Sequence, residues 1–368
     1  MEYTKIKEIN EYVAENINPM KTPDEVFEMY SVPTYDTGHP EYLRGDEIAS
    51  NKMIVRKNDV LLCKINPRIN RVWVVQEESE YKNIASSEWI VVRNSYYNPE
   101  FLAWYFRNPK FKKLMTSEVT GIGGSLTRAQ PKAVAEYPVP VMKREEQDKI
   151  VEVLNMTAGV IKSRQQELKK LDNLIKARFI EMFGDPVTNP YSLPIVTLGE
   201  LSELITKGAS PSWQGFSYTD DSTQTLFVTS ENVRAGYMDL SSPKYIEDSF
   251  NDKQKRSVIH KGDFLINIVG ASIGRAAQFH LDCKANMNQA AALVRVNDYR
   301  IRDKYLLIYL NSERAQRMYD SMKSDTGRAN LSLQDISDLS ILLPSIEQQI
   351  KFEIFVTQVD KSKVAVQK

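Results

Sequence analysis

The stretch from about Lys143 to Phe183, KREEQDKIVEVLNMTAGVIKSRQQELKKLDNLIKARFIEMF, organises the whole chain. Apolar residues recur three and four positions apart, with Glu, Lys, Gln and Arg between them, which is typical of a long amphipathic helix with a coiled-coil-like seam. Only Gly159 interrupts it. At about 1.5 Å per residue, such a helix is a rod of roughly 60 Å. Its predicted seam consists of Val151, Leu154, Ala158, Ile161, Leu168 and Ile175.

The start of this helix has a second copy near the C-terminus. Arg144–Leu154 lines up with Ser345–Phe355, and upstream of each, Arg56–Leu62 resembles His260–Ile266. A duplication of about 200 residues, in which a globular domain is followed by a helix, explains the chain better than a single domain. In the second helix Phe352, Phe355 and Val359 repeat the register of the first seam, so the helices can pack side by side and antiparallel.

The predicted fold class is therefore α+β, with two globular domains separated by long antiparallel α-helices and related by a pseudo-twofold internal duplication. The expected boundaries are 1–142 for the first domain, 143–185 for the central helix, 186–344 for the second domain and 345–368 for a C-terminal helix. Because the last helix is much shorter than the central one, either the chain is cut short or half of the central helix pairs with something else.

Composition agrees with two ordinary globular domains. The chain has 368 residues, 42% of them hydrophobic, and its 48 Lys and Arg balance 48 Asp and Glu. This balance argues against a stand-alone DNA-binding protein. Cys63 and Cys283 suit a reducing cytoplasm and predict neither a disulfide framework nor a zinc site. The sequence shows no candidate membrane span or signal peptide, so we expect a cytoplasmic protein.

Polar loops occur at matching places in the two halves. In the first half, predicted strands at 60–65 and 72–76 flank Lys64–Arg71, which is dense in Lys, Arg and Asn; a solvated basic hairpin loop is an equally good interpretation. A short helix is expected at 10–18. Predicted helices at 99–117 and 303–323 are each followed by Thr-Gly, a polar loop and a short strand that ends in proline.

In this order the residues resemble the specificity subunit of type I restriction-modification systems, commonly called HsdS, over essentially the whole chain. The second half carries the Gly-x-x-Pro-Ser opening of a target recognition domain at Gly208–Ser212, a Gly-x-x-x-Gly loop at Gly270–Gly274, and the pairs Gly262-Asp263 and Asn288-Gln289. Pro140 with Glu146-Gln147, and Pro344 with Glu347-Gln348, precede the helices. The first domain lacks the Gly-x-x-Pro-Ser opening and has Lys-Ile-Asn-Pro-Arg in place of the glycine loop.

The resemblance implies a DNA-recognition subunit without catalytic residues, metal or bound cofactor. Its implied partners are double-stranded DNA, two methyltransferase (M) subunits that hold S-adenosylmethionine, and restriction (R) subunits. The apolar helix positions above, with Phe352, Phe355 and Val359, are the expected packing and docking surface, and the unpaired part of the central helix is a possible site of self-association. Two readers on a rod predict a split target with half-sites about one helical turn or more apart.

Loop side chains are the predicted base and phosphate contacts, because Arg pairs with guanine and Asn or Gln with adenine. The candidates in the first domain are Lys64, Asn66, Arg68, Asn70, Arg71, Ser125 and Arg128. Those in the second domain are Lys207, Ser210, Ser212, Trp213, Asn232, Arg234, Ser272, Arg275, Gln289, Arg328 and Asn330.

Two other classes of protein fit part of the sequence. A coiled-coil scaffold whose globular ends bind proteins explains the long helix and the neutral charge, but it gives no reason for polar loops at matching positions. An enzyme is disfavoured, because His39, His260 and His280 lie in unrelated contexts without metal-ligand spacing, and no Gly-x-Ser-x-Gly or Walker loop is present.

Overall fold

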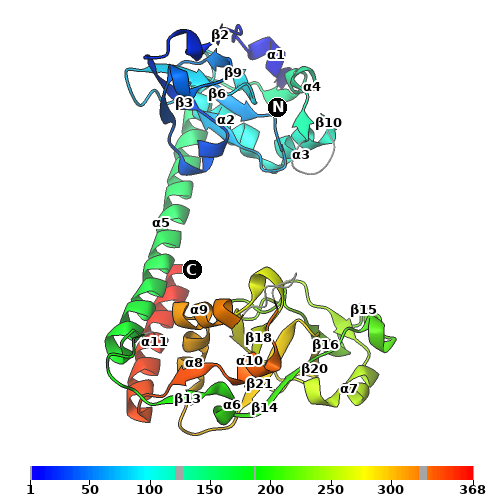
Figure 1. Cartoon of the computed structure of the whole chain (residues 1–368). Coiled ribbons are helices and arrows are strands. Elements are labelled where there is room, and N and C mark those ends of the chain that lie inside the picture. The colour runs from blue at the N-terminus through cyan, green and yellow to red at the C-terminus, as the bar shows by residue number, and fades with distance from the viewer. Residues whose placement is uncertain (1, 121–126, 186–187, 323–329, 368) are drawn as a thin grey trace. The chain divides into compact units, whose positions relative to one another are not determined.

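The computed structural model of the chain describes residues 2–120, 127–185, 188–322 and 330–367. It divides into two compact units, Met1–Ser163 and Arg164–Lys368. Within the described ranges, no helix is both long enough and apolar enough to cross a membrane. The mixed helix and sheet content confirms the predicted α+β class (Figure 1).

The described residues of unit 1 contain two larger sheets besides two two-stranded ones. The first has the order β2 (Asn16–Ile17), β5 (Lys52–Ile54), β8 (Lys82–Ala85), β3 (Val26–Tyr30) and β4 (Glu41–Arg44), and only β3 and β8 run parallel. The second has the order β7 (Val72–Val74), β6 (Val60–Cys63) and β9 (Trp89–Val92). All four residues of β6 are buried, which explains its continuous apolar sequence.

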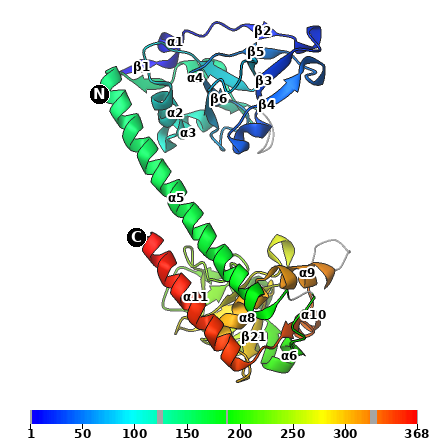
Figure 2. The same ribbon diagram turned by 90° about the vertical axis from the view of Figure 1, so that its left-hand side faces the viewer.

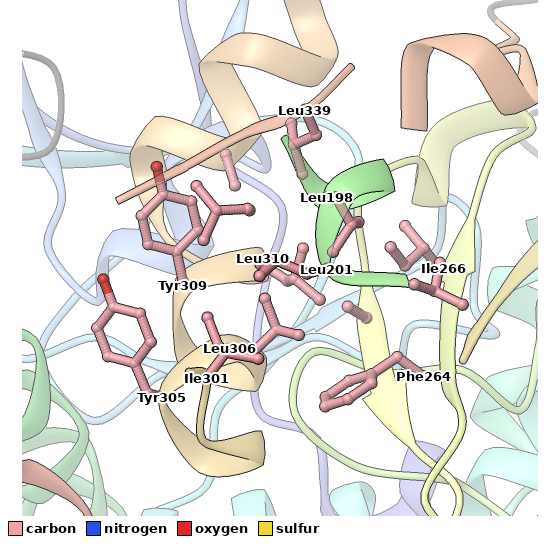
Figure 3. Packing of buried hydrophobic residues seen from close by; sticks show 14 of the residues in the cluster. Leu198, Leu201, Phe264, Ile266, Ile301, Tyr305, Leu306, Tyr309, Leu310 and Leu339 are labelled. Carbon is pink, nitrogen blue, oxygen red and sulfur yellow. The ribbon is translucent and has the colours of Figure 1, made fainter. Parts of the chain in front are cut away.

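Unit 2 also has two larger sheets, but their outermost strands differ from those of unit 1. One sheet has the order β14 (Ser202–Lys207), β21 (Ala291–Val296), β18 (Phe264–Asn267) and β19 (Ala276–Gln278). The other has β15 (Tyr218–Thr219), β17 (Tyr245–Ile246), β16 (Thr225–Val228) and β20 (Ala285–Met287), with β16 and β20 parallel. Its main core packs Leu198 and Leu201 against Phe264, Ile266 and the face of one helix that carries Tyr305, Leu306 and Tyr309 (Figure 3).

The duplication is confirmed element by element. In each unit the first strand pairs antiparallel with the short strand that precedes the long helix: β1 (Tyr3–Lys5) with β12 (Pro138–Pro140), and β13 (Ile195–Thr197) with β22 (Ser340–Leu342). Each unit also contains a parallel strand pair, β3 with β8 and β16 with β20. The smaller elements are α1 (Ile6–Ile9), β10 (Val119–Thr120), β11 (Arg128–Ala129), α4 (Pro131–Ala135), α6 (Leu198–Leu201), α7 (Ser249–Lys253) and α10 (Leu333–Ser337).

The central helix is a single element, α5, from Arg144 to Phe183, and the last helix, α11, runs from Ile346 to Gln367. Within unit 2 they lie side by side (Figures 1 and 2). Phe352 of α11 contacts Phe179 and Phe183, whereas Lys363, further along α11, pairs with Asp172, earlier in α5. The two helices therefore run antiparallel, as the sequence predicted.

Three details of the predicted elements were wrong. Residues 10–18 form no helix. The Asn10 side chain donates to the Val91 carbonyl of β9 and accepts from the Arg93 N–H just after it, and β2 pairs with β5 in a sheet. The helix predicted at 99–117 is two helices, α2 (Pro99–Arg107) and α3 (Pro109–Ser117). Proline cannot donate the hydrogen bond that would continue α2, so Pro109 starts a new helix instead. The helix predicted at 303–323 is likewise α8 (Asp303–Leu310) and α9 (Glu313–Met322).

The sequence alignment of the two long helices was also shifted by one residue. It paired Gln147 with Gln348, whereas the structure gives the same buried position and the same kind of bonds to Gln147 and Gln349. Both helices begin with a Glu-Gln pair and the second has two consecutive glutamines, so sequence identity alone selected the wrong one.

Candidate nucleic-acid interface

In unit 2, the ends of four strands meet at one edge of the two sheets. Lys207, the last residue of β14, lies opposite Ala292, and Asn267, the last of β18, lies opposite Ala291. The parallel strands β16 and β20 end together, since Val228 is in register with Met287. The loops that leave these strands consequently emerge side by side and form one surface, which we call the unit 2 loop end: residues 208–217, 229–244, 268–275, 288–290 and Asn330.

Close backbone contacts and the hydrogen bonds of one buried side chain hold these loops together. Gly208 approaches so closely that a Cβ atom there would lie 1.8 Å from the Met287 carbonyl oxygen, which explains the glycine in the Gly-x-x-Pro-Ser opening. Asn267 donates from its amide to the Ser230 and Val233 carbonyls and to the Ser272 hydroxyl, so one buried side chain joins two loops. A bridge between Val269 and Asn330 adds Asn330 to this surface.

Several predicted contacts are exposed on this loop end. Trp213 lies on a short 3-10 turn, η4 (Ser212–Gln214), and is 85% exposed, which is unusual for so large an apolar side chain. The structure therefore does not give Trp213 a core role. Ser210 and Ser212 lie within hydrogen-bonding distance of each other beside it. The other exposed candidates are Lys207, Arg275, Gln289 and Asn330.

Other candidates in unit 2 are already engaged inside the domain. Asn232 is 7% exposed, accepts hydrogen bonds from Thr229 and donates to the Asp239 carbonyl, so its amide is used in shaping the loop. Arg234 pairs with the Asp239 carboxylate at 3.1 Å. The Ser241 hydroxyl, its main-chain N–H and Arg234 hold the pKa of Asp239 below its usual value. Arg328 lies outside the described residues.

The corresponding loop of unit 1 joins β6 to β7. Asn66 and Asn70 both have positive φ, at 47° and 54°, a conformation that asparagine tolerates better than most residues. The Asn66 N–H donates to the Thr127 carbonyl and the Ala129 N–H donates to the Lys64 carbonyl, which places the predicted Lys64–Arg71 loop beside Arg128. These two candidate segments are thus one surface, the unit 1 loop end.

The charged groups of the unit 1 loop end differ in exposure. Arg128 makes two hydrogen bonds to the carboxylate of Glu88, at 3.1 and 3.2 Å, and these bonds raise its pKa. Arg68 is exposed, and Lys64 and Arg71 are half-buried. Burial raises the pKa of the Cys63 thiol beside them, so the thiol form is favoured. Ser125 lies outside the described residues.

Sequence reasoning missed one loop of this surface. Residues 31–40 leave the end of β3, which corresponds to β16, and therefore occupy the place of the 229–244 loop of unit 2. They contain the 3-10 turn η2 (Pro33–Thr37) and His39, which is 75% exposed and lies 3.2 Å from Glu78. Pro33, Gly38 and Pro40 are typical of a loop, but only the pairing of β3 with β8 shows where it lies.

The described part of the chain contains no group of three or more His, Cys, Asp or Glu residues placed to hold a metal ion. What both units present is a set of polar loops carried by the ends of buried strands, next to a long helix. This duplicated arrangement provides two candidate binding surfaces, each made of loops.

Comparison with known proteins agrees. Residues 194–368 match the family model described as the type I restriction modification DNA specificity domain. The EcoBI specificity subunit of the type I restriction enzyme from Escherichia coli is 31% identical over 118 residues, which cover 32% of this chain and 25% of that relative. The matched region thus spans only a quarter of the relative's length.

Two solved structures share the fold. One comes from a study of complex assembly and conformational transition in the type I restriction-modification system; it covers 99% of this chain and 91% of its own, with 20% identity and a TM-score of 0.56. The S subunit from M. genitalium covers 100% and 91%, with 13% identity and a TM-score of 0.51. Residues 194–368 thus belong to the family of type I restriction modification DNA specificity domains, and the chain as a whole shares the fold of a solved type I S subunit.

Proposed function

We propose that this chain reads a two-part DNA target, with one half-site for each loop end. The observation that carries the proposal is the repetition of one arrangement: in both units the polar loops leave the ends of equivalent buried strands. Base edges in the major groove are read by Arg, Lys, Asn and Gln side chains, and those residues are concentrated on both surfaces. The exposed Arg68 of unit 1 and the exposed Arg275 and Gln289 of unit 2 are the principal candidates.

The balanced charge suggests that the chain needs partners. Phosphate contacts supply most of the non-specific affinity of DNA-binding proteins, and a chain with equal numbers of acidic and basic residues gains little of it. Two methyltransferase subunits, with S-adenosylmethionine as their cofactor, would hold the duplex and modify it, and restriction subunits would cut it. Catalysis and cofactor binding then belong to the partners, and this chain selects the site.

The first half of α5 offers a surface for such partners. Val153, Met156, Val160 and Ile161 are 54 to 65% exposed, although apolar. Leu154 and Ala158 of the predicted seam are half-buried, and Val151 is buried against the core of unit 1. We propose the exposed stretch as part of the docking surface for a methyltransferase subunit.

The test is selection from a degenerate duplex library with the chain alone and with its cognate methyltransferase subunit. Enrichment of two short motifs separated by a spacer of fixed length supports the proposal. No enrichment even with the partner favours a protein-binding scaffold instead. In parallel, the pure chain incubated with labelled S-adenosylmethionine and DNA should transfer no methyl group; robust methylation would show that the chain is itself an enzyme.

A further inference from the structure

Two glutamines occupy the same position at the start of the two long helices. Gln147 lies in the first turn of α5 and Gln349 in the first turn of α11. The exposed fraction of each is 0%, although glutamine is usually found at protein surfaces. A buried amide must be matched by hydrogen bonds, since leaving it unmatched is costly.

Gln147 bridges two segments of unit 1. Its Oε1 atom accepts a hydrogen bond from the main-chain N–H of Asn98 at 2.8 Å, and its Nε2 atom donates to the carbonyl of Met142 at 2.8 Å. Asn98 is the N-cap residue of α2, and Met142 belongs to the segment that leads into α5. One side chain thereby joins the beginning of α5 to the beginning of α2.

Gln349 makes the equivalent bonds in unit 2. Its Oε1 atom accepts from the N–H of Arg302, the N-cap residue of α8, at 2.8 Å. Its Nε2 atom donates to the carbonyl of Pro344 at 2.9 Å and to that of Arg300 at 2.8 Å. The residues that bind the two glutamines thus occupy matching places in the two units. Their own side chains can differ, because they bind the glutamines through main-chain atoms only.

Side-chain contacts also join each long helix to the short helix whose first residues its glutamine binds. In unit 1, Trp104 of α2 donates to Asn155 of α5 at 2.8 Å. In unit 2, Glu353 and Asp360 of α11 pair with Arg302 and Lys304 at 2.7 and 3.1 Å. These side-chain pairs differ between the units, whereas the glutamine is the same in both.

A neutral amide suits this place for a chemical reason. It accepts with one atom and donates with the other, so it can bind an N–H and a carbonyl at once. A methionine of similar size would leave both main-chain groups unpaired in a buried place, and a carboxylate would turn an acceptor toward the carbonyl. The identity of residues 147 and 349 therefore controls how firmly each helix is attached to its domain.

We propose that Gln147 and Gln349 are positioning residues that fix the direction in which each long helix leaves its recognition domain, and that they thereby set the spacer length of the DNA target. This inference rests on the proposed reading of a two-part target. A helix that can pivot at its first turn would accept spacers of several lengths, whereas a fixed helix accepts one.

The experiment uses the full chain in complex with its methyltransferase subunit. Wild-type selection first defines the half-sites and the preferred spacer; if no split motif appears, the proposed function fails before the glutamines are tested. Competition binding then compares duplexes whose spacers differ by one and two base pairs. For Gln147→Met we expect the discrimination between the preferred spacer and its neighbours to fall by about tenfold, since orphaned buried groups cost enough to shift an equilibrium by that factor. The half-site bases should stay the same.

Matched controls separate positioning from stability. Gln166→Met changes an exposed glutamine of the same helix and should keep the wild-type spacer discrimination. Gln147→Glu should lose discrimination at pH 8 and regain it near pH 5, because a buried carboxyl group has a raised pKa and, once protonated, can donate and accept like the amide. Gln349→Met tests the second unit, and also serves if Gln147→Met does not fold. Equal loss of affinity at every spacer, or unchanged discrimination in folded Gln147→Met and Gln349→Met, would overturn the proposal.

Discussion

At the scale of single residues, each of the two units contains an equivalent buried ion pair. Asp59 is 1% exposed and receives two hydrogen bonds from the guanidinium group of Arg93, at 2.7 Å each, and a third from the Arg56 N–H. Asp263 receives the same set from Arg295 and the His260 N–H. Each pair ties the turn before a central strand to the neighbouring strand, so its loss should loosen the sheet that carries the loops.

We predict that Asp59→Ala destabilises unit 1 by about 3 kcal/mol or more, because it leaves a partly buried guanidinium group without its partner. Buried Trp73 and Trp89 both lie in unit 1, whereas Trp213 of unit 2 is exposed, so tryptophan fluorescence during urea unfolding reports on unit 1. Asp24→Ala is the control: its pair with Arg44 is exposed, and its removal should leave the midpoint nearly unchanged. Equal midpoints for the two variants would contradict the prediction.

Asp148 at the start of α5 gives a prediction for pH. The Asn98 amide, and then Arg144, lower the pKa of its carboxyl group in the folded protein. A lowered folded pKa means that the carboxylate favours the folded state; its contribution is present above the unfolded pKa, about 3.9, and is lost as the pH falls through the folded value. The contact of α2 with α5 should therefore weaken in that acid range. The indole N–H signal of Trp104, which is bonded to Asn155, measures this in a tryptophan-labelled sample.

Asp148→Asn should remove this acid-dependent change in the Trp104 signal, while Glu146→Gln, which alters an exposed neighbour, should preserve it. A change of the same size and midpoint in both variants would assign the acid response to other groups.

At the scale of elements, the pairing of α5 with α11 depends on an aromatic cluster. Phe352 is fully buried and its ring lies 5.6 Å from that of Phe179 and 5.4 Å from that of Phe183. We predict that Phe352→Ala costs about 3–5 kcal/mol and releases α11, seen as loss of hydrogen-exchange protection along that helix. Ile354→Ala, at a residue 55% exposed on the same helix, should keep the protection. Full protection in Phe352→Ala would mean that the helices are held by other contacts.

The elements that the sequence predicted best are those with a strong period. The forty-residue pattern gave α5, and the repeat near the C-terminus gave α11 and its antiparallel partner. Local patterns could not reveal that Pro109 divides one expected helix, because proline is also accepted in the first turn of a helix. Nor could they reveal that residues 10–18 are not helical, because Asn10 is held by side-chain hydrogen bonds to residues more than eighty positions away.

The candidate site was predictable in outline and not in detail. The lists of polar residues located the Lys64–Arg71 and Gly208–Ser212 loops, but composition cannot separate an exposed amide from one that folds the loop. Gln289 is exposed, whereas Asn232 is bonded to Thr229 and Asp239. Likewise, the bond between Arg128 and Glu88 joins residues 40 positions apart, which no local pattern can show.

At the scale of the whole molecule, the duplication predicts that the two half-sites can be altered separately. Arg275→Ala with Gln289→Ala should relax base preference in one half-site by about 1–3 kcal/mol for each lost base contact and leave the other half-site unchanged. Arg68→Ala should do the reverse. Sequencing of methylated adenines after expression with the partner subunits measures both. Loss of preference in both half-sites from either variant would contradict separate readers.

Under the proposed function, α5 connects the two readers, and its length can be changed without altering either loop end. Residues 160–167 of α5 are exposed, so seven residues of helical sequence inserted after Ser163 should be accommodated. They add about 10.5 Å, and because seven residues complete two turns to within about 20°, the faces of the helix stay nearly in phase. At 3.4 Å per base pair, the preferred spacer should lengthen by about three base pairs while both half-sites keep their sequence. A seven-residue insertion in the exposed turn after Asp220 of unit 2 is the control and should leave the spacer as it was. An unchanged spacer in the α5 variant would mean that something other than this helix determines the distance between the half-sites.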